Sequence, residues 1–274
     1  ASRTDSTIWF TGPERGSARA LHAVTTAGAV RTVMRSFGSL HLGDVAADGT
    51  VLLWNENSRL GLIGRMRGDT KDRDLSWLDW SNSPVISDDG KTLVFTEQGV
   101  GGGQEYSVYL RTMDGGPALR LGSGTATDIS KDGKWVLTVR LNPAPAQLVL
   151  LPTGAGEPRV VTSDTLVHDF GKFTVDGAQI VFGGYEPGQQ PRIHLQDLSG
   201  GAPKPITPEG VVGIPSPDGR LTAFDGKIYS GDGAPPRPVP GLEADDRVIA
   251  WASEPRGLFV ARRNESGAVQ IVRL

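Results

Sequence analysis

The chain has 274 residues, and its 28 Lys and Arg against 31 Asp and Glu give a net charge of −3, which leaves no basic field to attract nucleic acid. It contains no cysteine, which excludes disulfide bonds, thiolate zinc sites and cysteine nucleophiles. Its 37 glycines and 19 prolines favour many short elements joined by turns over a helical bundle.

A short motif, Ser-x-Asp-Gly followed by an apolar run, recurs along the chain. Clear copies begin at Ser87, Ser130 and Ser216. Looser or degenerate copies begin at Ser2, Ala46, Thr174 and Ser253. Successive copies start about 40 residues apart, which is the repeat length of a four-stranded propeller blade. We therefore expect one small antiparallel sheet to be repeated along the chain.

The second strand of each repeat directly follows the motif and ends in a bulky residue. Second strands are predicted over residues 7–10, 51–54, 92–95, 135–139, 179–182, 221–224 and 258–261. Most end in an aromatic ring, at Phe10, Trp54, Phe95, Phe182 and Phe224. Such a row of rings is expected to fill one face of a buried sheet.

The remaining strands are predicted from apolar runs and turn residues. Third strands are predicted over residues 20–24, 60–64, 106–111, 147–151, 192–197, 227–230 and 269–274. Fourth strands are predicted over 118–121, 159–162, 204–207 and 237–239, and first strands over 84–86, 126–129, 171–173 and 248–252. Pro205 and Pro238 indicate that the fourth strand is an outer edge, because proline has no N–H to donate. No stretch has sustained helical periodicity, so almost no helix is expected.

These patterns predict an all-β fold, a β-propeller of four-stranded antiparallel blades, because radial repetition protects the edges of small sheets. Residues 1–274 are expected to form a single propeller domain. Seven blades are favoured, with the first or last incomplete, because no first strand precedes Ser2 and only two strands follow Ser253. Six blades are the alternative, with residues 248–252 closing the ring against the N-terminal strands.

The sequence resembles the TolB-like family of β-propeller repeats. The resemblance rests on the anchor Ser216–Gly219, the third-strand pairs that begin at Ile193 and Ile228, and the hairpin Gly200–Pro203. It covers essentially the whole chain and implies the fold, not a particular activity.

The segment Arg73–Ser81, with the later runs Asp89–Leu93 and Asp132–Trp135, is also similar to the C-terminal propellers of bacterial eukaryotic-like serine/threonine kinases. This resemblance implies a sensing or docking domain outside the cytoplasmic membrane, in the periplasm or at the cell exterior. The kinase domain is not among these residues. No apolar run approaches the roughly 18 residues of a membrane span, so none is expected in this chain.

Charged residues occur on the predicted innermost strands, at Asp44, Asp128 and Lys172. Such charges must face water or one another, so we expect them beside a hydrated central channel. They either form ion pairs with channel water or make a site for a polar ligand or cation. His41 and His168 come just before inner strands, near the channel mouth, but two histidines without a third ligand do not define a zinc site.

Long, dissimilar connections are expected on the face opposite the short turns, and loops of this kind often carry binding sites. The connection over residues 68–83 contains Trp77 and Trp80 among charged residues. The two rings form either an aromatic recognition surface or a small satellite core that caps a blade.

Three further features have structural interpretations. Asp169–Gly171 spells the kinase metal-binding triplet, but the rest of the kinase signature is absent. The glycine run over residues 99–103 precedes a predicted strand, so it is expected to be a flexible loop, not a phosphate cradle. His22 and His194 occupy third-strand positions where other repeats carry tyrosine, and they are expected to pack in their sheets.

The leading hypothesis is a non-catalytic sensor or docking domain of a larger bacterial envelope or signalling protein. No catalytic set, cofactor or metal site is predicted. The domain is expected to be monomeric and to bind a protein or small polar ligand on its long-loop face. The predicted binding surface consists of Trp77, Trp80, Asp44, Asp128, Lys172, His41 and His168. The alternative is an enzyme or enzyme-accessory propeller, of the lyase or hydrolase type or gating a peptidase, with its site at the channel mouth.

Overall fold

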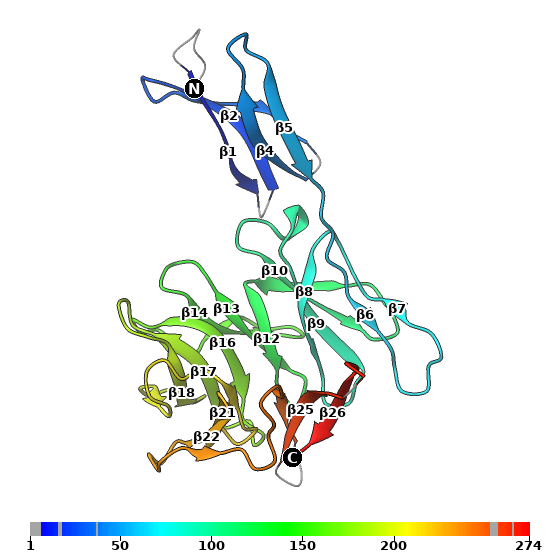
Figure 1. Cartoon of the computed structure of the whole chain (residues 1–274), viewed down its shortest axis with the longest axis vertical. Coiled ribbons are helices and arrows are strands. Elements are labelled where there is room, and N and C mark those ends of the chain that lie inside the picture. The colour runs from blue at the N-terminus through cyan, green and yellow to red at the C-terminus, as the bar shows by residue number, and fades with distance from the viewer. Residues whose placement is uncertain (1–6, 16–17, 37, 253–256, 265) are drawn as a thin grey trace. The chain divides into compact units, whose positions relative to one another are not determined.

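The computed structural model describes residues 7–15, 18–36, 38–252, 257–264 and 266–274 (Figure 1). In these residues the regular elements are β-strands, apart from one 3-10 turn, η1 (Val100–Gly102). The predicted all-β class is therefore confirmed. The chain divides into two compact units, Ala1–Ala126 and Thr127–Leu274.

The described part of the first unit contains four antiparallel sheets. A three-stranded sheet and a hairpin come first, formed by β1 (Thr7–Arg15), β2 (Ala18–Thr25) and β3 (Val30–Met34), and by β4 (Ser39–Val45) and β5 (Val51–Glu56). A second hairpin is formed by β6 (Ile63–Gly64) and β7 (Arg73–Asp74). A four-stranded sheet in chain order follows, formed by β8 (Ser81–Ile86), β9 (Thr92–Glu97), β10 (Ser107–Thr112) and β11 (Leu119–Ser123).

The second unit contains three four-stranded sheets and one three-stranded sheet among its described residues, each in chain order. The first two are formed by β12 (Thr125–Ile129), β13 (Trp135–Arg140), β14 (Gln147–Pro152) and β15 (Arg159–Val160), and by β16 (Val167–Phe173), β17 (Gln179–Tyr185), β18 (Arg192–Asp197) and β19 (Lys204–Pro205). The last two are formed by β20 (Ile214–Pro215), β21 (Leu221–Phe224), β22 (Lys227–Ser230) and β23 (Arg237–Pro238), and by β24 (Arg247–Trp251), β25 (Leu258–Arg263) and β26 (Val269–Arg273).

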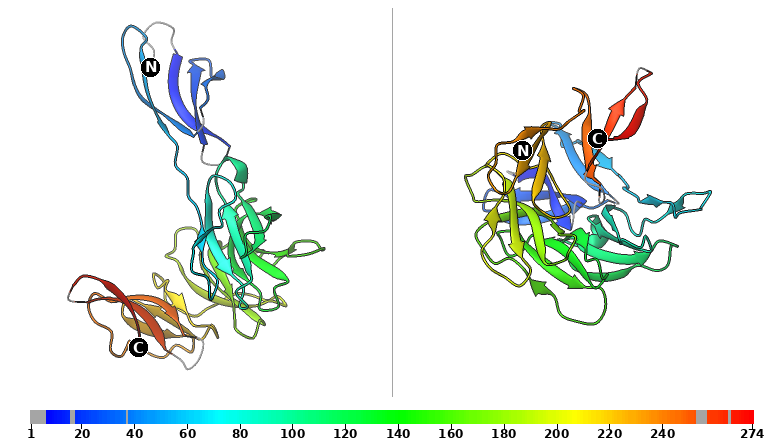
Figure 2. Two further views of the ribbon diagram at one scale, coloured as in Figure 1. Left: turned by 90° about the vertical axis from the view of Figure 1, so that its right-hand side faces the viewer. Right: turned by 90° about the horizontal axis from the view of Figure 1, so that it is seen from below.

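The core of the second unit lies between successive sheets, which follow one another from green to red in Figure 2. Leu137 and Phe182 belong to a buried cluster between the β12–β15 and β16–β19 sheets. Val181 points to the opposite face of β17, because side chains alternate along a strand, and joins another cluster. Ala223 and Leu258 are buried together between the last two sheets. Each sheet is thus stabilised mainly by burial against its neighbours.

The repeated motif forms the tight turn between the first and second strands. In the copy at Ser130, the hydroxyl donates to Asp132 Oδ1 at 2.7 Å, and the Lys134 N–H donates to the same oxygen at 3.1 Å. Gly133 has φ +69°, a conformation that favours glycine. The Ser130 hydroxyl is the main reason that the pKa of Asp132 lies below its ordinary value. The motif therefore encodes a self-contained hydrogen-bonded turn.

The predicted row of buried rings is correct for some repeats and wrong for others. Phe95 and Phe182 are fully buried. Phe10 is exposed at its sheet surface, and Trp54 is 56% exposed. A ring is buried only where a neighbouring sheet packs over it. The spacing of the motif along the sequence does not predict where such a neighbouring sheet lies.

The repeat that starts at Ala46 does not form the predicted four-stranded blade. The strand predicted over residues 60–64 is reduced to Ile63–Gly64 and pairs with β7 instead of β5, so β4 and β5 form a separate hairpin (Figure 1). Leu60 instead bridges Trp80, and the Leu75 N–H donates to Leu62 O at 2.7 Å. The backbone groups of this segment are thus satisfied by the loop that precedes β8, which removes the need to pair with β5.

Candidate functional site

The loop that carries Trp77 and Trp80 is anchored on a buried carboxylate, that of Glu97 on β9. This side chain has no exposed surface. The Leu78 N–H donates to Glu97 Oε1 at 3.0 Å, and the Trp80 N–H donates to Oε2 at 3.3 Å. The Ser81 hydroxyl also donates to Oε1. Because a buried carboxylate needs such donors, Glu97 holds the loop in one conformation.

The glycine run after β9 allows this loop to pack closely. A Cβ on Gly101 would lie 2.4 Å from Leu78 Cδ1, and one on Gly99 would lie 2.2 Å from Asp79 Oδ1. A Cβ on Gly102 would lie 2.0 Å from the Glu97 carbonyl oxygen. Gly101 and Gly102 belong to η1, and Gly99 and Gly101 lie in close contact with the Trp77–Trp80 loop, whereas the flexibility expected of this segment remains a prediction.

Trp77 presents its ring at the surface of this anchored loop. Its side chain is 39% exposed, and the Arg111 guanidinium lies over the ring, 5.8 Å from the ring centre. Arg111 is itself buried and donates to the carbonyl oxygens of Leu75 and Ser76, both at 3.1 Å. Trp80 is half-buried. The loop therefore offers one exposed, preorganised aromatic ring and one ring that is partly covered.

Two of the predicted channel residues, His41 and Asp44, lie on β4 in the first unit. The His41 ring stacks on Trp54 at 5.0 Å, and its Nε2 lies 3.4 Å from Glu56 Oε2. Asp44 is exposed, and its Oδ1 accepts the Val45 N–H at 2.8 Å. The structure therefore places both residues on the β4–β5 hairpin, with partners from the same hairpin.

Asp128 and Lys172 lie on neighbouring inner strands of the second unit, β12 and β16. Asp128 Oδ2 accepts the Phe173 N–H at 2.8 Å and so links the two strands. Lys172 is exposed. Asp128 thus has a structural role between the two strands. A ligand site formed by Asp128 and Lys172 remains a prediction.

His168 packs in the core, as does the third-strand residue His194. The His168 side chain is fully buried, and its Nδ1 lies 2.9 Å from Ala146 O. The Phe182 ring lies 4.8 Å from His168 on one side and 5.3 Å from His194 on the other. The packing role predicted for His194 is confirmed, and His22 likewise stacks on Phe10 at 5.3 Å.

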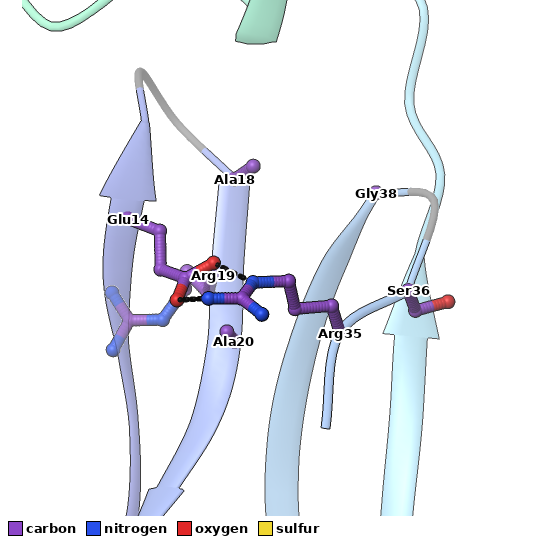
Figure 3. Close-up of a pocket in the computed structure, with 7 residues that line it drawn as sticks. All are labelled: Glu14, Ala18, Arg19, Ala20, Arg35, Ser36 and Gly38. Atoms are coloured by element: carbon purple, nitrogen blue, oxygen red, sulfur yellow. Dashed lines mark hydrogen bonds and ion pairs between the residues drawn. The ribbon is translucent and has the colours of Figure 1, made fainter. Parts of the chain in front are cut away.

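A hollow of about 490 Å³ at one end of the first three strands has three charged residues on its wall, Glu14, Arg19 and Arg35 (Figure 3). Arg35 donates to both carboxylate oxygens of Glu14, at 2.7 and 2.9 Å, as Figure 3 shows. This pair lowers the pKa of Glu14 and raises that of Arg35. Within the residues that the structure describes, no three His, Asp or Glu side chains gather closely enough to hold a metal ion.

Comparison with solved structures identifies the fold. TolB from Acinetobacter baumannii is similar with a TM-score of 0.53 and 18% identity, over 83% of this chain and 62% of TolB. An oligogalacturonate lyase in complex with manganese is similar with a TM-score of 0.56 and 11% identity, over 98% of this chain and 85% of the lyase. A prolyl endopeptidase is similar with a TM-score of 0.50 and 14% identity, over 99% of this chain and 49% of the endopeptidase.

These similarities confirm that the chain has a β-propeller fold, and at such low identity they show the fold alone. No protein-family profile and no curated protein sequence matches the chain. The chain spans less than two thirds of TolB and about half of the endopeptidase. The described residues contain no helix with the length and apolar character needed to cross a bilayer. The number of blades and the single-domain organisation stay predictions.

Proposed function

We propose that this chain is a non-catalytic recognition domain that binds a protein partner through the surface around Trp77. The observation that supports this most is the combination of an exposed tryptophan with a loop fixed by the buried Glu97 carboxylate. Tryptophan and arginine dominate the binding energy of many protein interfaces. A preformed loop also loses little conformational entropy on binding.

The domain is proposed to act outside the cytoplasm, as the sensing or docking part of a larger envelope or signalling protein. The resemblance of Arg73–Ser81 and the later repeats to the C-terminal propellers of bacterial kinases supports this proposal. Fractionation of cells that produce the complete protein tests the location. Recovery of the domain only in the cytoplasm would contradict it.

Affinity capture tests the proposed surface. The immobilised chain is mixed with an extracellular and envelope extract of the source organism, and retained proteins are identified by cross-linking and mass spectrometry. We expect one partner to be retained by the wild type and lost with Trp77→Ala. Trp54→Ala is the matched control, since Trp54 is also exposed but lies on the β4–β5 hairpin. Equal capture by all three chains would remove Trp77 from the function.

Metal analysis of the purified chain tests the non-catalytic part of the proposal. The competing enzyme hypothesis would use the channel residues, among them Asp128 and Lys172. We expect no stoichiometric transition metal after dialysis. A stoichiometric metal that is lost with Asp128→Asn would favour the enzyme hypothesis instead.

A further inference from the structure

An open cavity lies between the last two sheets of the second unit, β20–β23 and β24–β26. Its volume is about 240 Å³. Among the described residues, its wall is mostly apolar and carries a single charged side chain, that of Arg237 on the short outer strand β23. An apolar cavity of roughly 150 Å³ is large enough to bind benzene. This cavity therefore has room for a small apolar molecule.

Arg237 lies on the face of its sheet that packs against the next sheet. Ala223 lies opposite Ile228, and Ile228 lies opposite Arg237. Residues that lie opposite one another on neighbouring strands point to the same face. Ala223 and Ile228 belong to the buried cluster between the two sheets. The exposed guanidinium is thus at the outer end of an apolar row.

The facing row on the last sheet consists of Trp251, Leu258 and Leu274. Trp251 lies opposite Leu258, and Leu258 exchanges two backbone hydrogen bonds with Leu274, at 3.0 and 2.8 Å. At the inner end, the Trp251 indole N–H donates to Ile214 O at 2.7 Å and holds the two sheets together. These three residues line the cavity from one side, and the outer part of the row that ends in Arg237 lines it from the other.

In the β12–β15 sheet the corresponding arginine has a partner within the chain. Arg159 lies opposite Leu150, which lies opposite Leu137, in the same arrangement as the row that ends in Arg237. The Arg159 guanidinium lies over the Trp135 ring, 5.4 Å from the ring centre. The ring therefore satisfies the charge by a cation–π contact.

The position that corresponds to Trp135 is occupied by Leu221 in the repeat with the cavity. Each of the two residues stands five places after the serine that begins its motif, and its N–H donates to that serine's hydroxyl, at 3.0 Å for Trp135 and 2.9 Å for Leu221. Leucine is smaller than tryptophan and has no π face. Among the residues that the structure describes, the Arg237 guanidinium has no hydrogen bond, ion pair or ring contact. Leucine at this position thus leaves both a cavity and an unpaired cation.

We propose that this cavity binds a small apolar carboxylic acid, with the carboxylate on Arg237 and the apolar body against Leu221 and Trp251. A guanidinium binds a carboxylate through two parallel hydrogen bonds. The single positive charge balances a monoanion, whereas a phosphate ester carries nearly two negative charges at pH 7. The apolar walls remove the body of the ligand from water. The proposal does not depend on the function proposed for Trp77.

Titration of the whole chain followed by NMR tests this proposal. The probe is 3-phenylpropionate, and the matched compound is 3-phenylpropanamide, which has the same ring and no charge. We expect saturable shifts of the Trp251 indole N–H and of amides around the cavity with the acid only. No shift at millimolar acid, or equal binding of the amide, would overturn the proposal.

A third probe separates the two sources of such a carboxylate, a free acid and the C-terminal residue of a peptide. Nα-acetyl-phenylalanine has the ring and carboxylate of 3-phenylpropionate together with the amide of a peptide chain. Binding of both acids supports a peptide C-terminus as the ligand. Binding of 3-phenylpropionate alone supports a free acid.

Variants of the cavity give the second part of the test. Arg237→Gln should weaken the affinity for 3-phenylpropionate about tenfold, the usual loss for a charged hydrogen bond. Leu221→Trp supplies the ring that Arg159 has, so it should fill the cavity and abolish binding while Arg237 is kept. Arg159→Gln is the control and should bind as the wild type does.

Thermal unfolding verifies that the variants are folded. Arg237 is exposed, so its replacement should leave the fold intact even where a larger side chain at Leu221 does not. An unchanged affinity in Arg237→Gln, or an equal loss in Arg159→Gln, would overturn the proposal.

Discussion

Two stacked ring pairs in this chain each contain the aromatic residue at the end of a second strand, and they have opposite surroundings. Phe182 stacks on His194 in the second unit, and Trp54 stacks on His41 in the first, with ring centres 5.3 and 5.0 Å apart. Phe182 has no exposed surface, whereas Trp54 is 56% exposed. Cross-strand register brings the rings together in both cases. Burial depends on a neighbouring sheet, which Phe182 has in the β12–β15 sheet.

The largest expected effect comes from truncating the buried ring. Phe182→Ala should lower the free energy of unfolding by about 3–5 kcal/mol, because it removes a core ring and leaves a cavity. Trp54→Ala should change it by less than about 1 kcal/mol. Urea denaturation of both variants measures the difference. Similar losses in the two variants would mean that Trp54 is covered in solution.

His194, the partner of Phe182 in the buried ring pair, should also make the free energy of unfolding depend on pH. Burial lowers the pKa of His194 to about 4 in the folded chain, and the pKa is near its ordinary value of 6.5 when the chain is unfolded. Between these values the unfolded chain binds a proton that the folded chain does not, so stability falls as the pH falls from 6.5 to 4. The loss approaches about 3 kcal/mol at pH 4.

Urea denaturation at several pH values between 7 and 4.5 measures this dependence. In His194→Gln the slope of stability against pH should decrease over that window, whatever the absolute stability of the variant. Carboxylates with a lowered pKa, such as Asp132, stabilise the chain above pH 4 and lose that effect only as the pH falls further. An unchanged slope in the variant would show that His194 titrates normally.

The Trp77–Trp80 loop gives an intermediate case, in which an exposed ring depends on close packing beneath it. Gly101→Ala places a methyl group 2.4 Å from Leu78 Cδ1 and should cost about 1–3 kcal/mol. It should also shift the indole N–H resonances of the loop. Gly154→Ala is the control, because its Cβ would meet no atom within 4 Å. Unchanged indole resonances in Gly101→Ala would contradict the described packing.

The strand order of most repeats was predictable from sequence because the motif turn and the aromatic position are local signals. Predicted second strands at 135–139 and 221–224, for example, correspond to β13 and β21. The role of Glu97 was not predictable, because its partners Leu78 and Trp80 lie on a separate loop. The cavity at Arg237 was missed for the same reason, since its walls come together only when the last two sheets pack against each other.

The smallest expected change in the free energy of unfolding concerns the motif turn, where burial contributes least to stability. The Ser130 hydroxyl donates to Asp132 Oδ1 at 2.7 Å and accepts the Trp135 N–H at 3.0 Å. Ser130→Ala removes both bonds, so it should cost about 1 kcal/mol at pH 7. It should also raise the pKa of Asp132 toward its ordinary value, since that hydroxyl is the main cause of the lowering.

Two-dimensional NMR titration of the Asp132 carboxyl carbon measures the change in pKa, and urea denaturation measures the change in stability. Ser58→Ala is a suitable control, because its hydroxyl bonds the exposed Glu56 carboxylate outside any motif turn. A loss in Ser130→Ala equal to that in Ser58→Ala would mean that the motif directs the chain during folding without stabilising the folded turn. A larger loss, with the rise in pKa, is expected because only Ser130 also bonds the backbone of the next strand.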